Sequence, residues 1–334
     1  MQAMQLDRVA SIATHPLHLR DVERPQPGPR QLLIKVSACG VCRSNLHTIE
    51  GDWVADGVPA KTPIIPGHEV VGTVAEAGSA VTEFVLGDRV GVQPLWWTDL
   101  TCEYCLTARE HLCPQKLITG ESVDGGYAEY MLAYADHTYH VPSNLNDAEA
   151  APLFCPGITA YHAVKLAELA PGKTAALFGM GGVGHMVIQF ARLAGAEIVT
   201  IARGERHRKL ATQLGSVRAL EPREVSALSK DGGVDAAFVF APSDDMFAQA
   251  YAAVKPGGIV VNGAAKNPGP IASGEEKQVR GSVIGPRHQM NDVLRIASEG
   301  KLNVVVETFP LKDAELALTR LKQGEIEARA VLVM

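Results

Sequence analysis

The most informative stretch of this 334-residue sequence is Thr174-Ala175-Ala176-Leu177-Phe178-Gly179-Met180-Gly181-Gly182-Val183-Gly184. Residues 174–178 form a short apolar run, which is typical of a strand buried on both faces of a parallel sheet. The glycines follow at once, and residues 185–193 have the pattern of a helix. This order indicates a dinucleotide-binding turn, in which the backbone approaches a pyrophosphate at the helix N-terminus. A glycine-rich loop without a ligand is the alternative, and the flanking pattern disfavours it. The candidate cofactor-binding residues here are Gly179, Gly181, Gly182, Val183 and Gly184.

Strand and helix patterns alternate after this loop. A strand is expected over 197–201, a helix over 205–214, and further strands over 235–240 and 258–262. Such alternation predicts a doubly wound parallel sheet, the Rossmann type of α/β fold. We place this dinucleotide-binding domain at 156–287, beginning with a helix over 159–170.

The residue after the second strand helps to choose between the two nicotinamide cofactors. An acidic residue there would bind the ribose 2′-hydroxyl of NAD, but this position holds Ala202, followed by Arg203. Without the carboxylate, a 2′-phosphate meets no repulsion, and the Arg203 guanidinium can bind it. We therefore expect NADP, with NAD as the alternative. Arg206, Arg208 and Lys209 are equally consistent with the solvated face of a helix.

The remaining sequence is different in character. Many short strand patterns with Gly and Pro between them, such as 31–36 and 87–92, suggest an irregular β-rich domain. The tail, from Asn291 onward, is expected to contain one helix, 313–321, and a last strand, 330–333, and to rejoin the first domain. We therefore place the catalytic domain at 1–155 and 288–334, which makes the chain a two-domain α/β protein.

Composition limits the functional classes. A net charge of −6 and a pI near 6.0 argue against nucleic acid or an anionic membrane as the main partner. No stretch approaches the roughly 18 apolar residues of a membrane span, and no secretory signal is visible at the N-terminus. The six cysteines suggest metal ligands before disulfides. We expect a cytoplasmic enzyme with a small-molecule substrate.

Two groups of residues are candidate metal ligands. Two thiolates and one imidazole suit Zn²⁺, and three protein ligands leave a position for substrate, as in a catalytic site. Cysteines at two-residue spacings on a loop are a strong signal for structural zinc, and a carboxylate can complete such a site. A loop that has lost its metal is the alternative for this second group. The first group is Cys42, His68 and Cys155, and the second is Asp99, Cys102, Cys105 and Cys113.

Several stretches belong to one wider pattern: Gly40-Val41-Cys42-Arg43-Ser44, Pro66-Gly67-His68-Glu69-Val70-Val71-Gly72, Gly87-Asp88-Arg89-Val90, Asp124-Gly125-Gly126-Tyr127-Ala128-Glu129-Tyr130, Cys155-Pro156-Gly157-Ile158-Thr159 and residues 179–184. In these, the chain resembles the zinc-dependent medium-chain alcohol dehydrogenases nearly from end to end. The resemblance implies a GroES-like catalytic domain, catalytic zinc on Cys42, His68 and Cys155, and Glu69 close behind the metal. Cys39 is then a buried packing residue. The implied reaction is hydride transfer between a nicotinamide cofactor and a small alcohol or aldehyde.

The resemblance also implies roles around the metal. A proton would leave through the Ser44 hydroxyl, the cofactor ribose and His47, whose ordinary pKa near 6.5 suits transfer. Asn45 departs from the aspartate usual in the family, and we expect its amide oxygen to accept the imidazole N–H of the zinc histidine. The remaining implied residues are Arg43 and Arg329 at the cofactor, Arg329 at its pyrophosphate, and Trp53 and Leu95 in the substrate pocket. Trp96 and Trp97 lie nearby in sequence and are equally consistent with packing.

Two alternatives stay open. A polyol or sugar dehydrogenase of the same fold would usually have glutamate where this chain has Cys155, and activity on sorbitol or glucose would reveal one. A nicotinamide-binding protein without turnover would be revealed by a metal assay with a simple alcohol. By analogy with relatives of this length we expect a homo-oligomer, a tetramer or a dimer.

Overall fold

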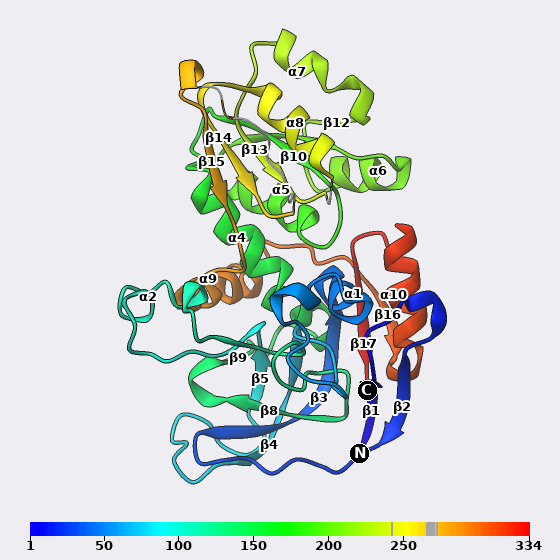
Figure 1. Cartoon of the computed structure of the whole chain (residues 1–334). Helices are drawn as coiled ribbons and strands as arrows, with labels where there is room; N and C mark the ends of the chain where they lie inside the picture. The colour runs from blue at the N-terminus through cyan, green and yellow to red at the C-terminus, as the bar shows by residue number, and fades with distance from the viewer. Residues whose placement is uncertain (242, 265–270, 272) are drawn as a thin grey trace. The chain divides into compact units, whose positions relative to one another are not determined.

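The computed structural model describes residues 1–241, 243–264, 271 and 273–334, which form two compact units (Figure 1). Unit 1 contains Met1–Cys155 and Pro286–Met334, and unit 2 contains Pro156–Gly285. Unit 1 is therefore built from both ends of the chain, whereas unit 2 is one continuous segment.

Unit 2 contains a parallel sheet of six strands in the order β12-β11-β10-β13-β14-β15. The first strand in sequence, β10, lies in the middle, because the chain runs to one edge through β11 and β12 and returns through β13. This is the doubly wound order, and the crevice for a ligand lies where it reverses, at the carboxyl end of β10. The predicted Rossmann-type sheet is confirmed. The strands are β10 (Thr174–Phe178), β11 (Glu197–Ile201), β12 (Arg218–Leu220), β13 (Val234–Val239), β14 (Val254–Asn262) and β15 (Gln278–Gly281).

The helices of unit 2 follow the strands in sequence. The helix expected over 159–170 begins earlier, at Pro156, and ends earlier, at Leu166, where the chain leaves the helix with Glu168 in the left-handed region at φ +52°. Strand β14 begins four residues before the expected position 258. The helices are α4 (Pro156–Leu166), α5 (Gly184–Leu193), α6 (Glu205–Gln213), α7 (Ser226–Lys230) and α8 (Asp244–Ala253).

Unit 1 is organised around the long strand β3, which pairs with β17, β4 and β8. Leu32, Ile34 and Val36 alternate along it and lie in the hydrophobic core. The main sheet consists of β3 (Gln31–Val41), β4 (Val70–Ala77), β5 (Arg89–Val92), β8 (Tyr130–Tyr134), β9 (Thr138–His140), β16 (Val306–Pro310) and β17 (Arg329–Val333). Two small sheets pair β1 (Gln2–Leu6) with β2 (Leu17–Asp21) and β6 (Leu95–Trp97) with β7 (Leu117–Ile118).

The helices of unit 1 are short apart from those of the tail. They are α1 (Arg43–Glu50), α2 (Glu103–Leu106), α3 (Asp147–Ala150), α9 (Arg287–Ser298) and α10 (Ala314–Gln323). The expectation of one tail helix was wrong, because α9 precedes α10. Helix α9 buries Met290, Val293, Leu294 and Ala297, and this amphipathic spacing is present in the sequence. A residue distant in sequence caps its first turn, because the Arg287 N–H donates to Glu110 Oε1 at 2.7 Å.

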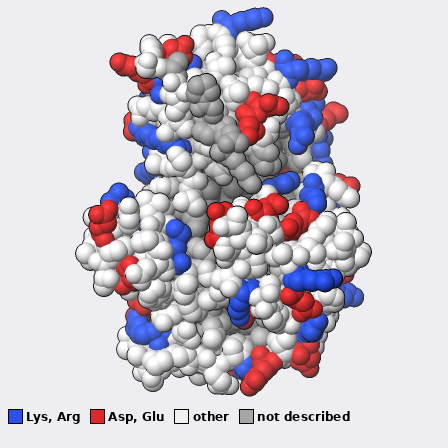
Figure 2. Space-filling model, in the orientation of Figure 1, with Lys and Arg blue, Asp and Glu red and all other residues white. Residues whose placement is uncertain are grey.

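The outer surface carries both charges. On the face drawn in Figure 2, acidic and basic side chains are interspersed. Among the described residues, no helix has the length and apolar character needed to cross a membrane.

His185, in the first turn of α5, makes unit 2 sensitive to acid. Its side chain is fully buried, and its Nδ1 lies 3.3 Å from the Gly181 carbonyl. Burial lowers the pKa of His185 from 6.5 to about 4. Because the unfolded chain binds this proton more readily, the stabilisation is complete above pH 6.5 and disappears as the pH falls toward 4.

We therefore predict that His185→Gln loses less stability than wild type between pH 7 and pH 4.5. The difference should be about 2 kcal/mol in the free energy of unfolding of unit 2, measured by denaturant titration at both pH values. His288→Gln, at an exposed position, is the control and should follow wild type. An identical acid dependence in His185→Gln and wild type would contradict the assignment.

Candidate active site

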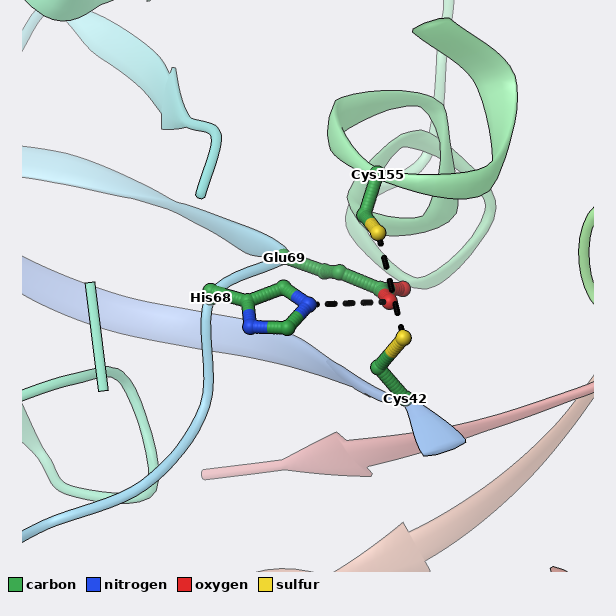
Figure 3. Close-up of side chains that lie close together, drawn as sticks. All are labelled: Cys42, His68, Glu69 and Cys155. Atoms are coloured by element: carbon green, nitrogen blue, oxygen red, sulfur yellow. Dashed lines mark hydrogen bonds and ion pairs between the residues drawn. The ribbon is translucent and has the colours of Figure 1, made fainter. Parts of the chain in front are cut away.

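Four side chains from distant parts of unit 1 meet at the end of β3 (Figure 3). Cys42 directly precedes α1, His68 and Glu69 precede β4, and Cys155 follows a 3-10 turn at 151–154. Their ligand atoms all lie within 4.8 Å of one another, and the two Sγ atoms are 3.8 Å apart. The structure thus brings together the three ligands predicted for the catalytic zinc, with Glu69 beside them.

This cluster is buried, and its donor set includes two soft sulfur ligands. His68 and Glu69 are almost completely buried, and each cysteine is only 9% exposed. The hydrogen bond from Cys155 and the charge of Arg329 hold the pKa of Cys42 well below its usual range. Two thiol ligands, one favoured as thiolate, with an imidazole and a carboxylate fit Zn²⁺ better than the harder cations. Cys39 lies outside the cluster and is fully buried, and burial raises the pKa of its thiol.

Glu69 is held by a buried ion pair with Arg329. The Arg329 Nε donates to Glu69 Oε2 at 3.0 Å, and a second guanidinium nitrogen binds Glu69 Oε1. Gly40 leaves the room for this carboxylate, because a Cβ there would lie 1.9 Å from Oε2. In this structure the Arg329 guanidinium binds the Glu69 carboxylate and is not free to bind the expected pyrophosphate. A buried charge such as that of Glu69 requires a partner of this kind. The pyrophosphate contact stays a prediction.

Helix α1 places the residues of the expected proton path. Ser44 Oγ lies 3.3 Å from His68 Nε2, and His47 is three residues further along, on the same side of the helix. His47 Nδ1 lies 2.5 Å from Asp52 Oδ2, and its ring is 5.0 Å from that of Trp53. The sequence analysis missed Asp52, although its position just after the helix-ending Gly51 was a usable signal.

One expectation about this helix was wrong. Asn45 presents its amide nitrogen, not its oxygen, to His68 Nδ1, at 3.2 Å. The oxygen is occupied by other donors, the Cys42 N–H at 3.1 Å and the Tyr127 hydroxyl at 3.2 Å.

Glu121 is a second residue that sequence reasoning missed. Burial raises the pKa of Glu121 to about 7, although the charge of His68 opposes this. Its backbone carbonyl accepts from Ala60, which fixes the segment. The acid is visible in Thr119-Gly120-Glu121, but no motif draws attention to it.

The second predicted metal group also comes together. The ligand atoms of Asp99, Cys102, Cys105 and Cys113 lie within 4.8 Å of one another. Asp99 Oδ1 accepts the Cys102 N–H at 2.8 Å, and this hydrogen bond, with that of Thr101, lowers the pKa of the carboxyl. Its Oδ2 lies 3.3 Å from the Cys113 Sγ. A carboxylate and three cysteines in this arrangement fit a four-coordinate zinc site.

In unit 2 the glycine loop follows β10 as expected. Gly179 has φ +107°, and a Cβ there would lie 2.7 Å from the Ala241 nitrogen. A Cβ on Gly184 would lie 2.2 Å from the Gly179 carbonyl, whereas Gly181 has open space around it. The first and last glycines are thus required by the turn, and the middle one leaves room for a ligand.

Ala202 directly follows β11 and is buried, and Arg203 beside it is exposed. Among the described residues none pairs with the Arg203 guanidinium. Arg208, in contrast, donates to the Ala202 and Arg203 carbonyls at 3.0 and 2.8 Å and pairs with Glu221. Arg208 therefore holds the turn and is not a solvated helix cation.

The remaining predicted residues are less informative. Leu95 is fully buried, Trp53 is partly exposed, and Arg43 begins α1 partly exposed, so their contacts with ligands stay predictions. Trp96 is 7% exposed and its indole N–H donates to the Leu132 carbonyl, which is consistent with a packing role. A cavity of about 390 Å³ next to Trp96 contains none of the metal-ligating residues.

Comparison with known proteins agrees with this geometry. Residues 28–143 match the alcohol dehydrogenase GroES-like domain, and residues 182–299 match the zinc-binding dehydrogenase domain. An alcohol dehydrogenase of Geobacillus stearothermophilus is 40% identical over 325 residues, which are 95% of both chains. A probable alcohol dehydrogenase of Mycobacterium tuberculosis is 39% identical over 345 residues, 100% of this chain and 97% of the relative. The solved alcohol dehydrogenase of Aeropyrum pernix superposes with a TM-score of 0.93 at 28% identity, over 100% of both chains.

A GroES-like unit with two thiols and a histidine, joined to a doubly wound sheet, defines a zinc-binding dehydrogenase. The chain belongs to the zinc-dependent medium-chain alcohol dehydrogenase family.

The Glu69–Arg329 pair supports the cluster energetically. We predict that Arg329→Met destabilises unit 1 by about 3–5 kcal/mol, because it leaves a buried carboxylate unpaired. The double variant Glu69→Gln/Arg329→Met should recover part of that loss in denaturant titrations. Arg320→Met, which removes the partly exposed pair with Glu307, is the control and should cost at most about 1 kcal/mol. A loss of that small size in Arg329→Met would show that Glu69 is solvated.

Proposed function

We propose that this chain is a zinc- and NADP-dependent alcohol dehydrogenase, or aldehyde reductase, that acts on small alcohols and aldehydes. The observation that carries the proposal is the convergence of the Cys42, His68, Glu69 and Cys155 ligand atoms within 4.8 Å. Bound there, zinc would polarise a carbonyl or lower the pKa of an alcohol. The bulky Trp53 and Leu95 would favour slim primary substrates over branched ones.

The chain's own residues would hold the substrate oxygen and remove its proton. Ser44 Oγ, at 3.3 Å from the ligand nitrogen of His68, is in position to hydrogen-bond an oxygen bound beside that nitrogen. A bound nicotinamide would supply the hydride acceptor for alcohol oxidation, and Ser44 and His47 would carry the released proton away from the substrate oxygen. Asp52 would fix the orientation of the His47 ring. Glu69 would balance the charge behind the metal.

We predict about two zinc ions per chain, one in each cysteine cluster. Cys42→Ala should abolish turnover while cofactor binding, measured by nucleotide fluorescence, remains. Cys105→Ala should lower thermal stability more than kcat, because its site would hold the 99–113 loop. Elemental analysis that gives no zinc in Cys42→Ala would remove the Asp99 site and leave the catalytic proposal standing.

The cofactor assignment is tested by steady-state kinetics with NADPH and NADH and a panel of short aldehydes. A charge-assisted hydrogen bond from Arg203 to the 2′-phosphate contributes about 1.5–3 kcal/mol, so wild type should prefer NADPH by about tenfold or more in kcat/KM. Arg203→Ala should weaken NADPH binding and leave NADH nearly unchanged, and Ala202→Asp should shift the preference toward NADH.

Arg206→Ala is the matched control, since it removes a neighbouring cation of α6. An equal loss in both arginine variants would assign the effect to general charge. A wild-type preference for NADH would refute the role given to Arg203.

A further inference from the structure

Asn45 lies fully buried between three groups, and its carboxamide contacts each of them. It is the third residue of α1, where its Oδ1 accepts the Cys42 N–H at 3.1 Å and the Tyr127 hydroxyl at 3.2 Å. Its Nδ2 lies 3.2 Å from His68 Nδ1. Burial raises the pKa of Tyr127 well above its usual range, so this hydroxyl keeps its proton.

The orientation of the Asn45 amide is fixed by a neighbouring group that can only donate a hydrogen bond. The Cys42 N–H belongs to the backbone and can only face an acceptor. With the amide reversed, its NH₂ would face this N–H, which would place two donors together in a fully buried site. The capping arrangement at the start of α1 therefore directs the amide nitrogen at His68.

This orientation selects one tautomer of His68. A neutral imidazole has one N–H and one acceptor nitrogen. Because Nδ1 faces an NH₂ donor, Nδ1 must be the acceptor and the proton lies on Nε2. Nε2 is the nitrogen that faces the cluster, at 3.3 Å from Ser44 Oγ and 3.9 Å from Glu69 Oε1. A metal bound through Nε2 requires the opposite tautomer, with the proton on Nδ1.

We propose that Asn45 is a positioning residue that opposes the metal-binding tautomer of His68, so that the catalytic zinc of this chain is held loosely and exchanges readily. The proposal rests on the zinc site of the proposed function. A carboxylate at this position would have one oxygen for Cys42 and Tyr127 and a second to accept the Nδ1–H. Partners of this kind change metal affinity by about 10–100-fold.

The first test is zinc affinity, measured by competition of the metal-stripped full chain with a chromogenic chelator. Asn45→Asp should bind zinc at the catalytic site about tenfold or more tightly than wild type. Asn146→Asp is the matched control, because the Asn146 side chain also caps a helix, by accepting the Glu149 N–H, but is exposed. Introduced into Cys42→Ala, the Asn45→Asp change should have no effect on the remaining zinc.

The second test separates the hydrogen bond from the added charge, since a carboxylate attracts zinc in any case. With ¹⁵N-labelled histidine in the metal-free chain at about pH 8, above the ordinary histidine pKa, two-bond ¹H–¹⁵N correlations identify the tautomer. His68→Gln assigns the signal. Wild type should carry its proton on Nε2 and Asn45→Asp on Nδ1.

The outcomes are distinct. A wild-type His68 with its proton on Nδ1 overturns the inference, and so does an unchanged or weaker zinc affinity in Asn45→Asp. If Asn45→Asp does not fold, the wild-type spectrum alone decides. Equal zinc binding in wild type and Cys42→Ala would instead refute the proposed catalytic metal site.

Discussion

The structure of unit 1 depends on one buried charge. Glu69 has no contact with water, and a carboxylate in such a place is tolerated only with a well-placed partner. Arg329 supplies it from β17, whose register with β3 sets Ala330 opposite Val41 and Val331 opposite Gly40. The strand pairing, the missing side chain at Gly40 and the ion pair together determine where the carboxylate lies relative to the Cys42 thiol.

The parts of this arrangement that depend on local sequence patterns could be predicted. The strand, glycine loop and helix of unit 2 lie in one continuous segment, and their pattern gives the doubly wound sheet directly. The metal ligands are separated by up to 113 residues, and only the residue types and the family resemblance grouped them. Helix α9 was overlooked although its apolar spacing is regular, since the expected tail began at Asn291, inside it.

The rest could not be predicted, because it depends on the direction of hydrogen bonds between distant groups. The sequence shows asparagine at position 45, but only the three-dimensional neighbours show which end of its amide meets His68. In the same way, the sequence around Arg208 is typical of a surface cation. The structure shows that its guanidinium donates to two backbone carbonyls and so stabilises the turn after β11. The raised pKa of Glu121 arises from burial, which its local sequence does not signal.

The two-segment construction of unit 1 also imposes an order on biosynthesis. Glu69 leaves the ribosome 260 residues before Arg329, and strand β17 must arrive before β3 has its full set of neighbours. Unit 2 is one uninterrupted segment, so its sheet can form before the C-terminal part of unit 1 has been synthesised. During that interval the Glu69 carboxylate has no guanidinium partner, and the thiols of Cys42 and Cys155 lie beside an unpaired charge. Strand β17, which is synthesised long after the metal-ligating residues, thus supplies the partner of Glu69.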